Sequence, residues 1–508
     1  MTPASNLASR SGSLTLKRFS LRSSTRRTWN SLEQRGASPI SLVLIALCGM
    51  GGYLGIGIHG LCVILLLACL IYEFQKRLDQ GMPLMQVAAL LAALQWCLGP
   101  YLAFVTGITT DRYFMYVEDV TYFSFAIPGT AAFAFGLLSV GSSVKQRGLL
   151  KSVRRENFVT TGLILTGIAF AGRFGAPYVP GGLAFALHLL SQLSYVGVLY
   201  FLFSRSPYRW PLITVALFPL FRQTAESAMF HDLLLWLGLL FCFWYGMKKH
   251  STGGKMALLV GAGIVLFTIQ AVKENYRAKV WHGKEASFAG EVVEFWSSAG
   301  EMKSDEVLPN VIARLNQGWI ISAVMRNVPV QEPYAEGETL VIAFAGAFVP
   351  RFLWQDKVKA GGQVNFRRFT GLNLADSTSM AISPLGEAYA NFGVEGGIGL
   401  MLLFGLGFSS IYALCLRWSL ARPDFLFWIP LIFYQAIKAE TEFATVLNQV
   451  SKGAVIAFGV YWLVRRQVIP IFFPPIRPIQ RRKRRRTGHR RSAGSATEDP
   501  ASPGQLPG

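Results

Sequence analysis

The chain has 508 residues, of which 52% are hydrophobic and 15% are charged, and its mean hydropathy is +0.37. This composition excludes an ordinary soluble protein, and with its frequent glycine and aromatic residues it predicts an all-α, polytopic membrane protein. The net charge of +21 is concentrated at the ends: residues 1–38 hold seven Lys or Arg against one Glu, and residues 465–508 hold eleven against two acidic residues. We expect both ends to lie on anionic lipid in the cytoplasm rather than to bind nucleic acid.

Apolar runs of membrane-crossing length follow the basic N-terminal tail. About twelve transmembrane helices are predicted by length, at residues 39–55, 57–73, 83–107, 121–142, 158–177, 182–204, 210–222, 229–246, 256–272, 393–416, 424–438 and 453–474. The first two runs could also form one long helix over 39–73. Gly51, Gly52, Gly55 and Gly57 favour a tight turn between them.

Lysine and arginine are frequent in every second loop, which predicts that both termini are cytoplasmic. The chain then divides into a basic cytoplasmic tail (1–38), nine spans (39–272), a large periplasmic or extracytoplasmic loop between the ninth and tenth spans (273–392), three spans (393–474) and a basic disordered cytoplasmic tail (475–508). Within the large loop we expect one or two amphipathic helices at 286–326. The apolar segment 339–349 is too short to span a bilayer and is expected to be interfacial or re-entrant.

Several arginines lie on the predicted outer side, where a planar guanidinium can donate two parallel hydrogen bonds to phosphate. Arg222 ends an apolar run, and Arg351 follows the apolar segment 339–349. Arg314 is followed by an Asn and a Gln, whose amides can bond sugar hydroxyls. We therefore take the three arginines as candidate substrate-binding residues. The alternative is that outer arginines pair with the thirteen acidic residues of the large loop.

A second cluster, SPLGEAYANFGVEGG at 383–397, leads into the predicted tenth span. Glu387 is a candidate catalytic base, because a carboxylate can accept the proton of an attacking hydroxyl. Tyr389 and Asn391 offer a stacking and hydrogen-bonding surface of the kind that sugars use. The alternative for Glu387 is a cap that complements the helix dipole. Asp376, in the preceding loop, is a second candidate base.

Other kinds of chemistry have little support in the sequence. The spacing of His, Cys, Asp and Glu resembles no zinc site, and there is no phosphate-binding loop or dinucleotide fingerprint, so we expect no metal and no cofactor. The six cysteines lie in apolar runs, which indicates packing rather than disulfides. His231 and Asp232 begin the predicted eighth span at its outer end, where they either belong to the site or cap the helix.

Three stretches carry a family resemblance: FRQTAES at 221–227, VPRFLWQDK at 349–357 and GEAYANFGVEGGIGL at 386–400. In this order and on the predicted side, the chain resembles the bacterial O-antigen and exopolysaccharide polymerases (Wzy-like oligosaccharide repeat unit polymerases), which are related to the O-antigen ligases. The resemblance implies that Arg222 and Arg351 hold a diphosphate, with Lys357 in the same loop motif, and that Glu387 is the base. The ligases carry a histidine before the last helix start. The stretch SMAISPLGEAY has none, which favours a polymerase.

The resemblance implies a glycosyltransferase of the bacterial cytoplasmic (inner) membrane, active in surface polysaccharide biosynthesis. It would pass a growing glycan from undecaprenyl diphosphate to the non-reducing end of a new lipid-linked repeat unit. Its expected partners are the undecaprenyl-diphosphate-linked oligosaccharide and membrane lipids, with a chain-length regulator and a flippase as further candidates. One alternative is a transporter or flippase, although we find no paired halves in the sequence. Another is a ligase-like glycosyltransferase.

Overall fold

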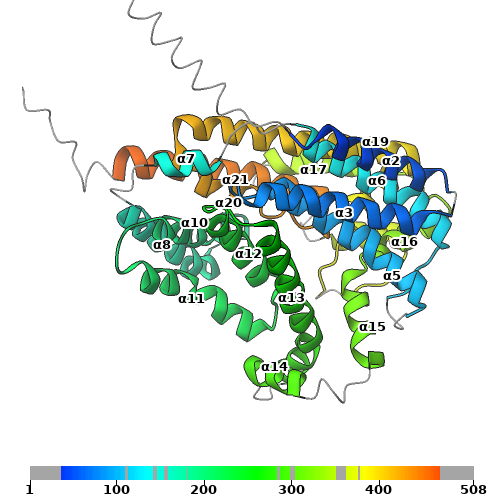
Figure 1. The fold of residues 1–508 in the computed structure, drawn as a ribbon, viewed down its shortest axis with the longest axis horizontal. Coiled ribbons are helices and arrows are strands. Elements are labelled where there is room, and N and C mark those ends of the chain that lie inside the picture. Colours follow the sequence, from blue (N-terminus) through cyan, green and yellow to red (C-terminus); the bar gives the residue numbers. More distant parts are fainter. Residues whose placement is uncertain are drawn as a thin grey trace, which may run out of the picture.

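The structure is a computed structural model, and it describes residues 36–55, 57–108, 113–140, 146–153, 158–179, 181–282, 287–297, 304–349, 362–375 and 378–468. All the regular secondary structure in these ranges is helical, which confirms the predicted all-α class. Figure 1 shows the helices as an elongated bundle, from which α13, α14 and α15 extend on one side.

The first half of the chain forms the helices up to α13. They are α2 (Pro39–Tyr53), α3 (His59–Leu78), α4 (Leu84–Ala93), η1 (Leu94–Leu98), α5 (Gly99–Thr106), α6 (Asp119–Ser139), α7 (Gln146–Ser152), α8 (Phe158–Gly175), η2 (Ala176–Tyr178), α9 (Gly181–Ser191), α10 (Leu193–Leu202), α11 (Arg209–Ser227), α12 (His231–Tyr245) and α13 (Thr252–Trp281). The second half forms α14 (Phe288–Ser297), α15 (Ser304–Leu315), α16 (Gly318–Asn327), α17 (Glu338–Phe348), α18 (Gln363–Thr370), α19 (Ser383–Ala421), η3 (Pro423–Trp428), α20 (Ile429–Phe433), α21 (Phe443–Leu463) and η4 (Val464–Val468).

Seven helical segments among the described residues are long and apolar enough to cross a membrane. They are Leu84–Thr106, Asp119–Ser139, Phe158–Tyr178, Leu183–Leu202, Thr252–Trp281, Ser383–Ala421 and Phe443–Arg466. Four further apolar helices, Pro39–Tyr53, His231–Tyr245, Glu338–Phe348 and Pro423–Phe433, are shorter than the roughly 20 residues that a span needs. The architecture is that of a helical membrane protein, while the count of about twelve spans stays a prediction.

Several helix boundaries differ from the predicted ones. The region 39–73 forms two helices, α2 and α3, as the glycine-rich turn predicted. The helices α19 and α21 begin at Ser383 and Phe443, well before the predicted starts at 393 and 453. The predicted span 424–438 is instead a 3-10 turn followed by the short α20, and prolines occupy the first turn of each. Proline is tolerated there because a first-turn N–H has no helical partner.

The core of the bundle is built where α6 packs along α19. Gly136 of α6 and Gly405 of α19 let the two backbones touch, because a Cβ added at Gly136 would lie 2.6 Å from the carbonyl oxygen of Leu402. Small residues allow this close approach between membrane helices. The hydroxyl of Ser409 adds a hydrogen bond to the carbonyl of Gly136, at 2.9 Å.

The long helix α19 is broken at Gly393. This residue has φ 66° and ψ −152°, so the helical segment before it and the longer one after it have different directions. An L-residue with a side chain rarely adopts such a conformation, and glycine adopts it without strain. The break folds the first segment back against the second, since a Cβ at Gly397 would lie 3.2 Å from the carbonyl of Ala388.

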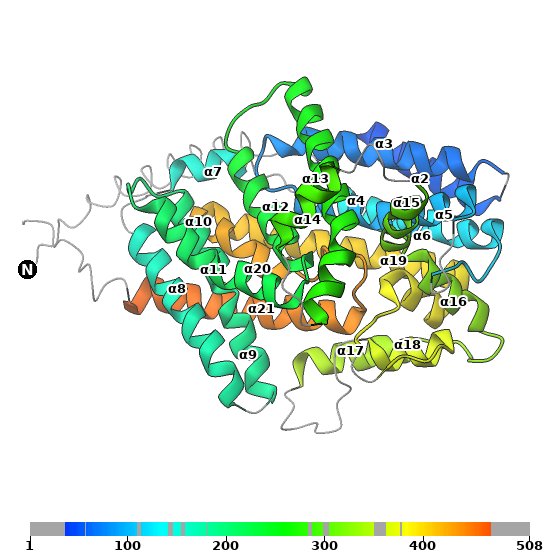
Figure 2. The ribbon, with the colours of Figure 1, turned by 90° about the horizontal axis from the view of Figure 1, so that it is seen from below.

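The predicted large loop contains helices α14 to α18 in its described part. The helix α16 packs against α18 and α19, and α17 packs along α21, as Figure 2 shows for this side of the bundle. Residues Gly318–Met325 of α16 are all buried. This stretch therefore packs within the core, whereas an amphipathic helix would keep one face exposed. The expected short segment at 339–349 is α17, which has eleven residues and exposes Val341, Phe344 and Phe348.

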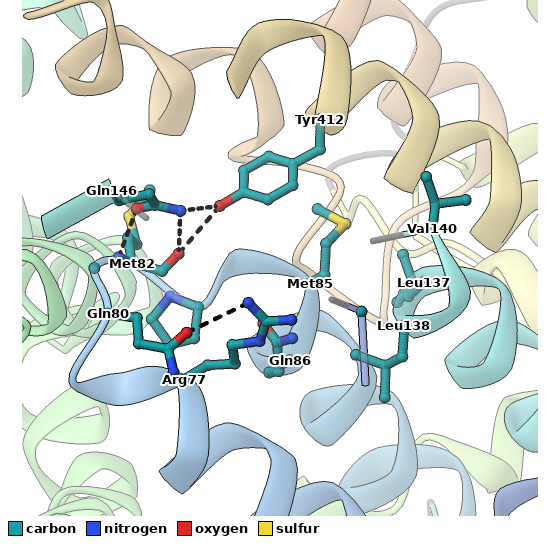
Figure 3. Close-up of a pocket in the computed structure, with 13 residues that line it drawn as sticks. Arg77, Gln80, Met82, Met85, Gln86, Leu137, Leu138, Val140, Gln146 and Tyr412 are labelled. Atoms are coloured by element: carbon teal, nitrogen blue, oxygen red, sulfur yellow. Dashed lines mark hydrogen bonds between the residues drawn. The ribbon is translucent and has the colours of Figure 1, made fainter. Parts of the chain in front are cut away.

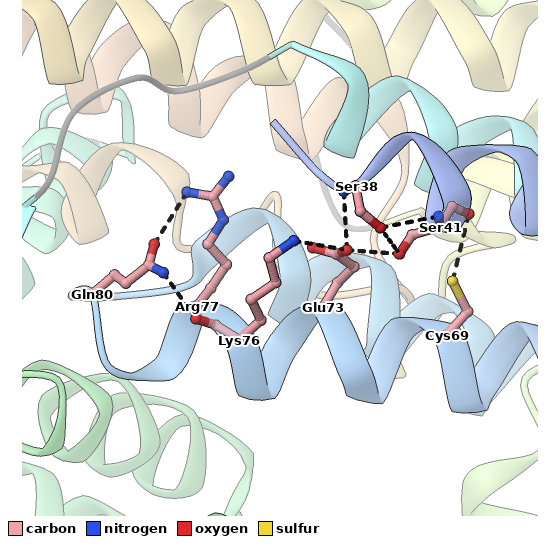
Figure 4. Close-up of polar contacts among 7 residues, drawn as sticks. All are labelled: Ser38, Ser41, Cys69, Glu73, Lys76, Arg77 and Gln80. Carbon is pink, nitrogen blue, oxygen red and sulfur yellow. Dashed lines mark hydrogen bonds and ion pairs between the residues drawn. The ribbon is translucent and has the colours of Figure 1, made fainter. Parts of the chain in front are cut away.

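A polar cluster fixes the start of α2 to the end of α3. Glu73 is fully buried, and its Oε1 accepts hydrogen bonds from the Ser38 N–H at 3.1 Å and the Ser41 hydroxyl at 2.7 Å. Lys76 approaches the same oxygen at 3.5 Å (Figure 4). The cluster therefore neutralises a buried carboxylate while it joins two helices.

The neighbouring turn between α3 and α4 is closed by Gln146 of α7. The Gln146 Oε1 accepts the Met82 N–H at 2.9 Å, and its Nε2 donates to the Tyr412 hydroxyl of α19 at 2.7 Å (Figure 3). A cavity of about 30 Å³ lies beside these residues, lined also by Arg77 and Gln80. It has room for about one or two waters. We interpret these hydrogen bonds as contacts that stabilise the fold and not as a ligand site.

Candidate functional site

Six consecutive residues, 438–443 (KAETEF), end at the first residue of α21 and connect distant parts of the fold. We call them the hub segment. The Trp96 indole N–H donates to the Ala439 carbonyl at 3.1 Å, which fixes the segment to η1. The side chains on either side of Ala439 contact α12, α18 and α19. The hub segment therefore gathers polar groups from elements more than 200 residues apart.

The first half of the site is a charged cluster at the start of α12. Lys438 Nζ donates to Asp232 Oδ1 at 3.0 Å, and the Tyr434 hydroxyl donates to the same oxygen at 2.7 Å. His231 Nδ1 lies 3.5 Å from Glu440 Oε1. The Lys438 side chain is 10% exposed and that of Asp232 is 50% exposed, so the pair lies at an open edge of the bundle. A ligand from outside can reach the carboxylate here.

The second half is a pair of buried carboxyl groups, Glu387 of α19 and Glu442 of the hub segment. Glu387 is fully buried, and its Oε2 accepts the Phe443 N–H at 2.9 Å. Glu442 is 3% exposed, and it accepts the Gly362 N–H at 3.0 Å and the Asn365 amide at 3.1 Å. It thereby fixes the start of α18.

One oxygen of Glu387 is buried without a hydrogen-bond partner in the described part of the chain. Its Oε1 accepts no hydrogen bond from the described residues, a property that it shares with Oε2 of the buried Glu73. Buried polar atoms nearly always have a partner, because an unpaired one costs free energy. Such a carboxyl oxygen can accept a hydrogen bond or a proton from a hydroxyl group. The expected alternative was a cap that complements the dipole of its own helix, whereas the hydrogen bond that Glu387 accepts comes from the first N–H of α21.

Asn391 and Tyr389 make hydrogen bonds and packing contacts within the fold. The Asn391 Oδ1 accepts the Gly337 N–H at 3.0 Å, while its Nδ2 donates to the Thr339 hydroxyl and to the Glu387 carbonyl, each at 2.7 Å. The Tyr389 ring packs edge-on against Phe125 with 5.1 Å between centroids. Both side chains are buried, so in this structure they position the helix that carries Glu387 and present no sugar-stacking surface.

The two described candidate arginines lie apart from one another. Arg222, on α11, is exposed, and its Nε donates to Glu226 at 2.7 Å. Glu226 precedes the large loop, so this is not one of the pairings with the loop's thirteen acidic residues that the sequence left open. Arg314, on α15, lies over the ring of Tyr113 with its guanidinium carbon 6.0 Å from the centroid. Figure 1 shows α11 and α15 on different parts of the bundle.

Another arginine of the predicted loop, Arg368 of α18, also pairs with acids. Its Nε donates to Glu332 at 2.5 Å and its Nη1 to Glu338 at 2.9 Å. The hydrogen bond to Glu332 and the pairing with Glu338 raise the pKa of Arg368. Arg326 of α16 is exposed and stacks over Tyr116 at 4.1 Å. The ion pairs of Arg368 brace α18 against the start of α17.

Three predicted site residues, Arg351, Lys357 and Asp376, lie outside the described residues. Gly362, which follows the segment that carries Arg351 and Lys357, donates its N–H to Glu442. The chain after this segment is therefore held at the buried carboxyl pair.

The hub segment was not selected from the sequence. Its signal is a charged run, Lys-Ala-Glu-Thr-Glu, between two apolar runs on the predicted outer side. The roles of the charged residues Lys438, Glu440 and Glu442 can be recognised only from the side chains and backbone groups that they contact in the fold. His231 and Asp232, left open as site residues or caps, contact the hub segment directly.

Comparison of the chain with family models, with curated proteins and with solved structures finds no match. Among the described residues, no group of three or more His, Cys, Asp or Glu side chains is placed to hold a metal ion.

Proposed function

We propose that the protein polymerises lipid-linked oligosaccharide repeat units at the outer face of a bacterial cytoplasmic membrane. The proposal includes about twelve spans, cytoplasmic termini and an extracytoplasmic loop at 273–392. It is supported by the three sequence stretches that resemble the Wzy-like polymerases, at 221–227, 349–357 and 386–400. The partners are then the undecaprenyl-diphosphate-linked glycan and the surrounding lipids.

The observation that carries the proposal is the placement of Glu387, a buried carboxyl with one oxygen that lacks a hydrogen-bond partner among the described residues. In the proposed reaction a hydroxyl of the acceptor repeat unit attacks the anomeric carbon of the donor glycan. A new glycosidic C–O bond forms, and the bond from that carbon to the diphosphate oxygen breaks. Glu387 accepts the hydroxyl proton, as a general base does.

The leaving group of this reaction is a lipid diphosphate, which gains negative charge as the bond breaks. Arg351 and Arg222 are proposed to bind it, because a guanidinium donates paired hydrogen bonds to phosphate oxygens. The contact from Gly362 to Glu442 supports this role for the loop that carries Arg351, since it holds the following chain at the carboxyl pair. Arg222 would exchange its exposed partner Glu226 for the diphosphate.

The test is deletion of the gene, followed by gel analysis of surface glycans. Loss of the protein should collapse a ladder of repeat units to a single unit, and the wild-type chain should restore the ladder. Arg351→Ala and Arg222→Ala should fail to restore it at equal protein levels. Arg417→Ala, at an exposed arginine near the end of α19, is the matched control and should restore it. Full restoration by both test variants would remove these residues from the site.

One observation favours a second candidate, a transporter or flippase. Gly393 breaks α19 beside Glu387, and transporters form their binding sites at broken helices. This candidate predicts that lipid-linked repeat units cross the membrane in vesicles that contain the purified protein, with no change in glycan length. The polymerase predicts longer glycans instead.

A further inference from the structure

A groove of about 450 Å³ opens at the start of α3, far from the hub segment in the sequence. Its volume lies within the range of roughly 300 to 1,000 Å³ that is usual for small-molecule sites. Its lining includes His59 at the start of α3, Tyr101 and Phe104 of α5, and Asp119 and Phe123 of α6. Nothing in the proposed transfer reaction uses these residues.

His59 is the group in this groove whose hydrogen-bonding capacity is unsatisfied in the part of the chain that the structure describes. It is 6% exposed, and neither ring nitrogen has a hydrogen-bond partner among the described residues. Its ring stacks on Phe123, with 5.6 Å between centroids, so its orientation is fixed. Buried imidazoles normally have partners. The described protein groups supply none, although the residue lines an open groove.

The other lining groups restrict the chemistry of that ligand. Asp119 is exposed at the rim, and one of its oxygens accepts the Val120 N–H at 2.8 Å. The described lining residues include no Lys or Arg, so among them an anionic ligand would meet a carboxylate without a compensating cation. Tyr101, Phe104 and Phe123 supply aromatic surface, on which an apolar ring face can pack.

Among uncharged and cationic ligands, the histidine favours a hydroxylated one. A neutral imidazole has one nitrogen that donates and one that accepts. A hydroxyl group both donates and accepts, so it satisfies either nitrogen in either tautomer, whereas an ammonium group can only donate. A metal ion would need more donors than His59 and Asp119, and the described residues form no group of three.

We propose that this groove binds an uncharged sugar ring of a glycan. The sugar's apolar face lies on the aromatic rings, one hydroxyl bonds to His59, and another bonds to the Asp119 carboxylate. The proposal concerns binding alone and is independent of the proposed transfer. The same sugar ring could belong to a soluble oligosaccharide or to the headgroup of a glycolipid in the membrane.

The experiment uses the full chain in lipid nanodiscs. Maltotetraose, mannotetraose and galactotetraose are titrated by saturation-transfer NMR, and a second set of nanodiscs carries a glycolipid with the same neutral headgroup. We expect at least one sugar to bind, and its affinity in the soluble and glycolipid arms identifies the source. His59→Phe should weaken binding about tenfold, the equivalent of one lost buried hydrogen bond. His59→Gln, which still donates and accepts, should retain more affinity.

The controls keep the result interpretable. His282→Phe changes an exposed histidine outside the groove and should leave binding unchanged. Asp119→Asn changes an exposed rim residue, so it tests the groove even if His59→Phe fails to fold. The proposal is overturned if none of the sugars binds in either arm, or if His59→Phe and Asp119→Asn both bind like wild type. Binding of tetramethylammonium or inorganic phosphate in place of the sugars also overturns it.

Discussion

Substitution of Glu387 separates a catalytic role from a structural one. Its Oε2 accepts the Phe443 N–H at 2.9 Å, and its Oε1 has no hydrogen-bond partner among the described residues. Glu387→Gln keeps an amide oxygen for that N–H and nearly the same volume, so we expect little loss of stability. Glu387→Ala leaves a buried N–H without an acceptor, which costs about 1–3 kcal/mol, and adds a cavity. If Glu387 is the base, both variants should lose about a hundredfold or more in rate.

The assay compares the two variants in the same membranes. Glycan chain length on gels reports activity, and the melting temperature of the purified protein reports stability. Glu395→Gln is the matched control, because this residue lies on the same helix and accepts a hydrogen bond from Tyr53 at 3.2 Å. We expect Glu387→Gln to lose activity at a wild-type melting temperature. Retention of more than a third of the activity by Glu387→Gln would refute the assignment of the base, whatever Glu387→Ala does.

Five further substitutions test other parts of the structure. Gly393→Ala places a side chain at φ 66°, so we expect about 1–3 kcal/mol of strain and a lower melting temperature. Gly136→Leu should prevent the close contact of α6 with α19 and abolish accumulation of folded protein on immunoblots. Lys438→Met and Asp232→Asn should each lower polymerisation, and their effects in the double variant should be less than additive, because the side chains interact directly. Glu73→Ala removes the acceptor of two hydrogen bonds and should lower the melting temperature without shortening the glycans of the remaining protein.

The helical class could be predicted from the sequence, because membrane helices are set by local runs of apolar residues. The glycine-rich break between α2 and α3 could also be predicted, because glycines that favour a turn are a local signal in the sequence. The start of α19 at Ser383 could not, since the stretch before Gly393 is less apolar than a span and is helical because it packs in the core. The burial of α16 was also missed, because its partners α18 and α19 lie far along the chain.

The site divides in a similar way. The sequence placed Glu387 just before a span predicted to begin at 393, whereas it lies within the first segment of α19, which begins at Ser383. Its buried neighbour Glu442 did not, because a single carboxylate between two apolar runs has no distinctive spacing. The contacts of Asn391 are equally long-range, since Gly337 and Thr339 precede it by more than 50 residues. Local patterns can suggest a reactive group, whereas its surroundings depend on the packed fold.

The most direct test of polymerisation uses the purified protein in nanodiscs with lipid-linked repeat units as its only substrate. The account predicts lipid-linked products that grow to several repeat units with the wild-type chain, and unchanged single units with Glu387→Gln. If the wild-type chain leaves every unit at its original length, or if Glu387→Gln elongates them at the wild-type rate, the account is contradicted.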